Sequence, residues 1–277
     1  MNKYVLKIKC SDEKGLIHKI ADVLYSNDLN IEKNNEFVDG ENKKFFFRAR
    51  IDGLIDSQKI VSELKAVMPK DAEITLVKKV KKKIIVLVTK ESHCLGDILL
   101  KHDSGELNAD IQAVVSNYDI LRPLCQKFDI PYHCVLSEGM SREEHEKAVL
   151  EVLGGYDVDY LVLAKYMRIL SENFVSQYDQ RIINIHHSFL PAFIGANPYK
   201  QAHKRGVKII GATAHFVNNN LDEGPIIAQD VIPVNHELNW KNMQRAGKNV
   251  EKTVLSNALD LVFDDKIFVH ANKTIVF

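Results

Sequence analysis

Residues 184–191 read NIHHSFLP and place polar side chains directly after the apolar pair Ile182 and Ile183. The carboxamide of Asn184 and the imidazole of His186 could donate hydrogen bonds to a carbonyl oxygen that becomes negative under attack. The imidazole could also deliver or accept a proton, so this pair of groups is suited to acyl transfer. The alternative is structural: Asn184 would cap a turn, and His186 would be a hydrogen-bonded histidine of the core.

Two histidines are adjacent here, and the geometry of a strand decides which of them joins Asn184. Successive side chains of an extended segment point to opposite faces. Asn184 and His186 should therefore share one face, and His187 should point to the other. We expect His186 in the site, with His187 and the neighbouring Ser188 in supporting roles.

A third chemical group lies in a polar loop at residues 215–227, between two apolar segments. Asp222 stands near the tip of this loop, and Gly224 and Pro225 follow it and favour a turn. A carboxylate presented by a shaped loop could orient and charge-stabilise the imidazole and bind an attacking water. Together, Asn184, His186 and Asp222 are the candidate catalytic residues.

A zinc site is a competing interpretation, because His186, His215 and Asp222 are residue types that bind zinc. Their spacing matches no local zinc motif such as H-E-x-x-H, and a zinc site would leave Asn184 without a role. A nucleotide cofactor is also disfavoured, since residues 83–97 contain neither G-x-G-x-x-G nor a P-loop. We therefore expect no metal and no bound cofactor.

Short apolar strands alternate with helices after residue 83, which predicts an α/β domain with a mostly parallel, Rossmann-like sheet covered on both faces. The expected strands are residues 83–88, 111–117, 132–136, 160–164 and 181–187, then an antiparallel extension at 209–217 and 224–234, a helix at 239–263 and a hairpin around 271–272. In such sheets ligands bind beyond the carboxyl ends of the strands, where the strand order reverses. Asn184 and His186 stand at such an end.

The first eighty residues predict a separate, ferredoxin-like unit in the order βαββαβ. Residues 78–83 read KKVKKK, a run of like charge that is typical of a solvated connector between domains. We therefore expect one domain at 1–80 and a second at 83–277.

The bulk properties restrict the class of protein. Lysine plus arginine equals aspartate plus glutamate, at 37 each, so no global basic field favours nucleic acid or anionic lipid. The start of the chain lacks the apolar core of a signal peptide, and no apolar run approaches the length of a membrane span. The four cysteines form no C-x-x-C pair, as expected of reduced thiols. We expect a cytoplasmic protein with no nucleic-acid and no membrane partner.

Residues 83–277 resemble the folate-dependent formyltransferase and formyl-hydrolase superfamily, whose core motif is Asn-x-His followed by an aspartate in a later loop. The segments that carry the resemblance are LAKYMRILS, NIHHSFLPAFIGANPY and GVKIIGATAHFVNNNLDEGPIIAQ. The resemblance implies Asn184, His186 and Asp222 as the catalytic residues. It also implies a folate pocket formed, largely through backbone groups, by Met167, Arg168, Ile169 and Leu170, together with His215.

The amino-terminal segment CSDEKGLIHKIADVLYSNDLNI resembles an ACT domain. The arrangement of an ACT domain before this catalytic domain is similar to that of superfamily members that hydrolyse 10-formyltetrahydrofolate to tetrahydrofolate and formate. The resemblance implies that the formate released is used for purine synthesis. Glu91 stands where transferases for glycinamide ribonucleotide bind phosphate, and Tyr118 stands where the superfamily pattern has histidine. The ACT resemblance implies a homo-oligomer, a dimer or tetramer, and an amino-acid effector bound near Gly15 and Leu16. Two alternatives remain open: formyl transfer to a small amine such as glycinamide ribonucleotide, and a non-catalytic amino-acid-responsive protein.

Overall fold

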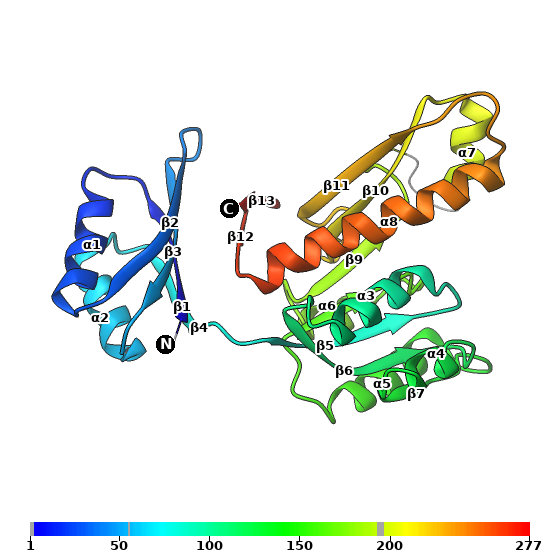
Figure 1. Ribbon diagram of the computed structural model, residues 1–277, viewed down its shortest axis with the longest axis horizontal. Helices are drawn as coiled ribbons and strands as arrows, with labels where there is room; N and C mark the ends of the chain where they lie inside the picture. Colours follow the sequence, from blue (N-terminus) through cyan, green and yellow to red (C-terminus); the bar gives the residue numbers. More distant parts are fainter. Residues whose placement is uncertain (1–2, 55, 193–196) are drawn as a thin grey trace. The chain divides into compact units, whose positions relative to one another are not determined.

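The structure, a computed structural model, describes residues 3–54, 56–192 and 197–277, which divide into two compact units (Figure 1). The first unit runs to Val80 and includes Asp264–Phe268 and Phe277. The second unit comprises Lys81–Phe263 and Val269–Val276. The sequence division placed all of residues 83–277 in the second domain, whereas the short stretch Asp264–Phe268 groups with the first unit.

The first unit has the expected order βαββαβ. Its elements are β1 (Lys3–Ser11), α1 (Leu16–Ser26), β2 (Asn30–Asp39), β3 (Lys44–Asp52), α2 (Ser57–Val67) and β4 (Glu73–Lys78). The strands form an antiparallel sheet in the order β2-β3-β1-β4. The ferredoxin-like prediction is therefore confirmed.

The core of the first unit follows from two periodicities. Leu6 and Ile8 lie two residues apart on β1 and face the same side of the sheet, and they pack in one cluster with Ile20 of α1 and Leu64 of α2. All four side chains are fully excluded from solvent. Burial of such a side chain stabilises a fold by about 1.5–3 kcal/mol, so this cluster is a substantial core for a small unit.

The second unit is an α/β domain. Its elements are β5 (Lys82–Val88), α3 (His93–Asp103), β6 (Ala109–Ser116), α4 (Arg122–Gln126), β7 (Tyr132–Cys134), α5 (Arg142–Leu153), β8 (Tyr160–Leu163), α6 (Glu172–Gln177), β9 (Ile182–His186), α7 (Pro198–Arg205), β10 (Ile209–Phe216), β11 (Ile226–Pro233) and α8 (Trp240–Phe263). The hairpin strands β12 (Ile267–His270) and β13 (Lys273–Val276) end the chain. All the expected strands are present, and the short helices α4 and α7 were not predicted.

The large sheet has seven strands in the order β11-β10-β9-β8-β5-β6-β7. The five strands from β9 to β7 are parallel, and β10 and β11 are antiparallel additions, as predicted. The chain builds β6 and β7 on one side of β5 and then crosses to place β8 on the other side. The strand order therefore reverses between β5 and β8, and this reversal is where the carboxyl ends of the strands splay apart to accept a ligand.

Local sequence signals explain several boundaries of these elements. Ser141 and Glu144 form the capping box that starts α5, and the hydroxyl of Ser171 accepts a hydrogen bond from the backbone of Phe174 at the start of α6. The apolar run of β5 is buried throughout residues 84–88, as expected of a central parallel strand covered on both faces.

Two further properties concern the environment of the chain. Within the described residues, no helix is long and apolar enough to cross a membrane. The four cysteines are free thiols, three of them buried, in agreement with the expectation of reduced cysteines.

Candidate active site

A cavity of about 530 Å³ opens at the carboxyl ends of β8 and β9. Asn184, His186 and Asp222 line it, as do His215 and the segment Met167–Leu170. The structure therefore brings together, around one cavity, all the residues that the sequence indicated for catalysis and folate binding. Their positions in it follow from strand register and from one tightly folded loop.

Strand register places Asn184 beside His215. In the antiparallel pairing of β9 with β10, residue 184 lies opposite residue 215, so the two side chains are cross-strand neighbours. The amide nitrogen of Asn184 lies 3.2 Å from Nε2 of His215, and Nδ1 of His215 lies 2.8 Å from the carbonyl oxygen of Phe216. Because a carbonyl can only accept, Nδ1 carries the proton, and Nε2 accepts from Asn184.

This arrangement fixes the orientation of the Asn184 carboxamide. Burial lowers the pKa of His215 below its ordinary value, so the ring is neutral and can serve as the acceptor. The amide group of Asn184 keeps a second N–H that His215 does not use. His215, which was expected to contact folate, is only 1% exposed and is placed to hold Asn184.

His186 ends β9 with one ring nitrogen engaged and the other available. Its Nδ1 lies 3.3 Å from Oδ1 of Asp222. Its Nε2 is buried and has no hydrogen-bond partner among the described residues. A buried polar atom without a partner is costly, so this nitrogen is placed to meet a ligand or water in the cavity.

Asp222 reaches His186 because the loop after β10 folds back tightly. Asp222 itself adopts a left-handed backbone, with φ of 58°. A Cβ atom on Gly224 would lie 1.7 Å from the carbonyl oxygen of Phe216, so this position accepts only glycine. The turn that was predicted from Gly224 and Pro225 therefore depends on close contact between backbone segments.

Asp222 is charged at neutral pH. Burial opposes ionisation, but the hydrogen bond and the electrostatic interaction with His186 outweigh it and lower the pKa of Asp222 below its ordinary value. Its Oδ1 also lies 3.8 Å from Nε2 of His215. The site thus contains a fixed carboxylate beside two imidazoles.

The alternation argument predicted that His187 faces away from the cavity, and this prediction is wrong. Strand β9 ends at His186, so the alternation does not extend to His187, which also lines the cavity. Its ring centroid lies 5.2 Å from that of His186 and 6.1 Å from that of Tyr199. Burial, together with the charge of Lys165, lowers the pKa of His187 to about 4, so the ring is neutral.

Ser188, for which a supporting role was predicted, forms two hydrogen bonds near the site. Its hydroxyl donates to the carbonyl oxygen of Ala192 at 2.7 Å, and its own carbonyl accepts from the hydroxyl of Thr213 at 2.9 Å. The first bond lies within the turn after β9, and the second fastens this turn to β10.

The segment Met167–Leu170 forms one wall of the cavity. Met167 and Ile169 are 63% and 57% exposed, so apolar surface is available for a flat ligand. The end of this wall is anchored from α5, because Glu146 accepts hydrogen bonds from the backbone N–H of Ser171, at 2.8 Å, and from its hydroxyl. Sequence reasoning missed Glu146. Glu146 and Ser171 are 25 residues apart in the chain, and only the tertiary fold brings them together.

The predicted effector residues lie at the start of α1 in the first unit. Gly15 has φ of 86°, and among the described residues no atom beyond its chain neighbours and its own helix lies within 4 Å of the position that a Cβ would take. The side chain of Leu16 is buried in the core of the unit, so only its backbone could contact an effector. Tyr118, the departure from the superfamily pattern, lies in the second unit with the ammonium of Lys90 over its ring.

Comparison with known proteins assigns the chain to a family. A model of the formyl transferase family matches residues 82–259, and a model of the ACT domain matches residues 4–67. The chain is 54% identical to a Haemophilus influenzae protein named formyltetrahydrofolate deformylase, over 100% of this chain and 99% of that protein. This chain belongs to the formyltetrahydrofolate deformylase family.

Other members of the family support the same assignment. A Bacillus subtilis formyltetrahydrofolate deformylase is 43% identical over 98% of this chain and 93% of its own length. The crystal structure of a formyltetrahydrofolate deformylase from Pseudomonas syringae superposes with a TM-score of 0.96 at 38% identity, covering 100% of this chain and 95% of that one. The glycinamide ribonucleotide transformylase 1 of Symbiobacterium toebii matches 71% of this chain and 94% of its own, with a TM-score of 0.68 and 28% identity. The family and the fold that the resemblance implied are therefore confirmed.

Proposed function

We propose that this chain hydrolyses 10-formyltetrahydrofolate to tetrahydrofolate and formate. The observation that carries the proposal is the convergence of Asn184, His186 and Asp222 on one cavity, in a chain that is similar over its whole length to formyltetrahydrofolate deformylases. A transferase would share these residues, but the full-length relatives favour water as the acceptor.

The proposed chemistry assigns one task to each of the three groups. Asp222 holds a water molecule against the formyl carbon, and the oxygen of this water forms the new bond to that carbon. The second amide N–H of Asn184 and the Nε2–H of His186 donate to the carbonyl oxygen as it becomes negative. The bond from carbon to N10 of the folate then breaks, and a proton that came from the water passes to N10 by way of Asp222 and His186.

The wall at Met167–Leu170 supports the folate part of the proposal. A pterin ring is flat and carries polar groups on its edge, so exposed apolar side chains beside free backbone groups suit it. His215 acts in this scheme as a positioning residue that orients Asn184. Hydrolysis of an amide changes no oxidation state, and we propose that it uses no metal and no resident cofactor.

Acceptor-independent release of formate is the test of this proposal. The purified chain is incubated with 10-formyltetrahydrofolate alone, and formate is measured with and without added glycinamide ribonucleotide. We expect formate in both samples and no formylated acceptor. Release that occurs only with the acceptor would support the transferase alternative, and no reaction in either sample would favour the non-catalytic alternative.

We propose that the first unit regulates this activity in the cytoplasm. The match to the ACT domain at residues 4–67 and the open backbone at Gly15 support binding of an amino acid by a homo-oligomer, either a dimer or a tetramer. Calorimetric titration with the common amino acids, together with light scattering, tests both parts. A monomer that binds none of them would overturn the proposal.

A further inference from the structure

A second cavity of about 220 Å³ borders the candidate active site, and the proposed chemistry leaves it without a role. The two cavities share Lys165, Met167 and His187 among their lining residues. The second cavity continues between α7 and α8, where Gln244 and Lys248 line it. The second cavity therefore adjoins the cavity that contains the candidate catalytic residues.

The charged lining of this second cavity is mostly paired. It carries three lysines and two glutamates: Lys165, Lys200, Lys248, Glu91 and Glu251. Glu91 pairs with Lys248 at 2.5 Å, and the ammonium of Lys200 lies over the ring of Trp240 at 4.7 Å. Apart from the histidines, the lining carries three positive and two negative side chains, a balance that favours a small anion over a cation.

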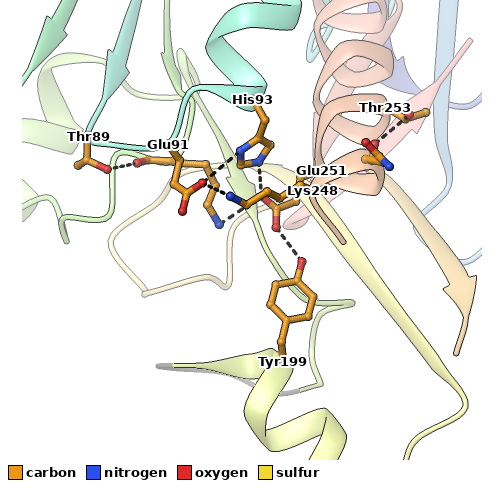
Figure 2. Close-up of polar contacts among 9 residues, drawn as sticks. Thr89, Glu91, His93, Tyr199, Lys248, Glu251 and Thr253 are labelled. Atoms are coloured by element: carbon orange, nitrogen blue, oxygen red, sulfur yellow. Dashed lines mark hydrogen bonds and ion pairs between the residues drawn. The ribbon is translucent and has the colours of Figure 1, made fainter. Parts of the chain in front are cut away.

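Glu251 of α8 organises the inner end of the second cavity (Figure 2). Its buried carboxylate accepts hydrogen bonds from the hydroxyl of Tyr199 and from Nε2 of His93, each at 2.7 Å. A Cβ on Gly247 would lie 2.1 Å from the Tyr199 hydroxyl, so glycine at 247 is what allows Tyr199 to reach Glu251.

The same carboxylate holds Lys165 at the boundary between the two cavities. Nζ of Lys165 lies 3.3 Å from Oε2 of Glu251. Burial opposes ionisation of Glu251, but His93, Lys165 and Tyr199 outweigh it and lower the pKa of Glu251 to about 2. The carboxylate is therefore charged and can hold the ammonium in place across the physiological pH range.

The backbone of Lys165 is held as firmly as its side chain. The residue has a left-handed φ of 65°, and its carbonyl oxygen accepts the hydroxyl of Thr89 at 2.8 Å. Its side chain is only 8% exposed. An ammonium has three donors, and Glu251 is the acceptor at this ammonium among the described residues, so donors remain for a ligand.

We propose that the second cavity is a carboxylate subsite that takes up the formate product, with the ammonium of Lys165 as its anion-binding group. The proposal rests on the proposed function, because hydrolysis generates formate beside His186 while tetrahydrofolate fills the first cavity. Formate is small and carries a single charge. The two glutamates on the lining would repel a dianion such as phosphate more strongly than a monoanion.

Direct binding of formate tests the subsite without turnover. Carbon-13-labelled formate is titrated by NMR into the full chain saturated with tetrahydrofolate. We compare the wild type with Lys165→Met and with Lys200→Met, a matched control that removes a lysine from the same cavity. Loss of a charge-assisted bond should weaken formate binding at least about tenfold in Lys165→Met and less than about threefold in Lys200→Met. Equal losses, or none, would overturn the proposal.

A steric variant guards against misfolding of Lys165→Met, which leaves Glu251 without its lysine partner. Gln244→Trp keeps every charge and narrows the cavity from α8, so it should also weaken formate binding about tenfold or more. Inorganic phosphate should compete only weakly. Phosphate binding tighter than formate binding would overturn the assignment of the ligand.

Kinetics separate this proposal from the proposed function. In the wild type, added formate should inhibit noncompetitively against 10-formyltetrahydrofolate, and Gln244→Trp should reduce this inhibition. If formate binding depends on Lys165 but the chain releases no formate from 10-formyltetrahydrofolate, the hydrolase proposal is wrong and the subsite proposal stands. If the chain hydrolyses 10-formyltetrahydrofolate but formate inhibits competitively and Lys165→Met does not change this inhibition, the hydrolase proposal stands and the subsite proposal is wrong.

Discussion

The imidazole of His215 decides which way the carboxamide of Asn184 points. Its Nδ1–H is committed to the carbonyl of Phe216, which leaves Nε2 as an acceptor for the amide nitrogen of Asn184. A flipped carboxamide would place an oxygen against this acceptor nitrogen and lose the hydrogen bond. The remaining amide N–H is therefore available for an oxyanion before any substrate arrives.

Asn184→Ala tests this role at the scale of one residue. Removing an oxyanion donor should slow the single-turnover rate by about 10²-fold or more, while a folate analogue still binds. His187→Ala is the comparison, and it should cost less than about tenfold, because Asp222 is paired with His186 and not with His187. Equal losses in the two variants would contradict the assignment of the oxyanion donor.

Asp222→Asn keeps the shape of the side chain and removes its charge. Turnover should fall by several orders of magnitude, because water positioning and proton transfer fail together. Rapid-quench rates and folate-analogue affinity, measured on the same samples, check whether the chemical step alone is affected. Near-normal rates would return Asp222 to the role of a turn residue.

The lowered pKa of Asp222 also makes a prediction about stability. A carboxyl group whose pKa is lower in the folded than in the unfolded protein stabilises the fold above its unfolded pKa of about 4, and this contribution is lost as pH falls through the folded value. The wild type should therefore be more stable than Asp222→Asn at pH 7, and the difference should shrink below about pH 4. Urea unfolding of both proteins between pH 3 and pH 7 measures it.

At the scale of elements, two loops must be held against the carboxyl ends of β8 and β9. The loop after β10 is held by close backbone contact at Gly224, and the wall at Met167–Leu170 is held by Glu146 of α5. The two devices differ in kind, since one is steric and the other is a charge-assisted hydrogen bond. We therefore expect different consequences when the backbone contact at Gly224 or the hydrogen bonding of Glu146 is disrupted.

Gly224→Ala should displace the loop that carries Asp222. A Cβ at 1.7 Å from a backbone oxygen cannot be accommodated without movement, so activity should fall at least about a hundredfold. Gly206→Ala is the control, because Gly206 has a positive φ of 70°, which strains alanine, but open space around the position of its Cβ among the described residues. That control should lose about 1–2 kcal/mol of unfolding free energy and keep its turnover rate.

Glu146→Gln should loosen the folate wall without touching the reacting atoms. Gln keeps the size of the side chain but weakens its bonds to Ser171, so KM should rise several-fold with kcat nearly unchanged. Glu143→Gln, on the exposed side of the same helix, is the matched control and should change neither constant. A fall in kcat with constant KM would show that Glu146 acts on the chemical step.

At the scale of the whole molecule, each unit has a core of its own, but the first unit takes in a segment distant in sequence. In that unit Arg48 donates to the carbonyl oxygens of Asp264 and Asp265 at 2.8 and 2.9 Å, and the ring of Phe46 meets that of Phe268 edge to face. The segment that follows α8 is therefore part of the packing of the first unit.

Separated fragments test this organisation. A fragment of residues 81–277 should fold and keep hydrolytic activity but lose its response to amino acids, because its core is complete without residues 1–80. A fragment of residues 1–80 should melt at a lower temperature than the same unit in the full chain, since it lacks Phe268. Differential scanning calorimetry of the full chain and of the two fragments measures these melting temperatures. An unfolded 81–277 fragment would contradict the domain boundary near residue 80.

Much of this protein could be predicted from its sequence, because the signals are local. Alternation and helical spacing predicted the strands of both sheets, the capping box at Ser141 and the long helix α8. The Asn-x-His pattern at 184–186 and the Asp222 loop indicated acyl chemistry from residue types alone. Each of these signals depends on residues within a few positions of one another, so no knowledge of folding was needed.

The tertiary structure alone decided how these groups meet. Strand β9 ends at His186, so the alternation of side chains does not extend to His187. The register of β9 with β10 places Asn184 beside His215. Lys165 and Glu251 are far apart in the chain, and only the packing of α8 brings them to one cavity. Periodicity describes which face of an element is buried, but it carries no information about which distant element covers that face. That choice depends on the packing energy of the whole domain.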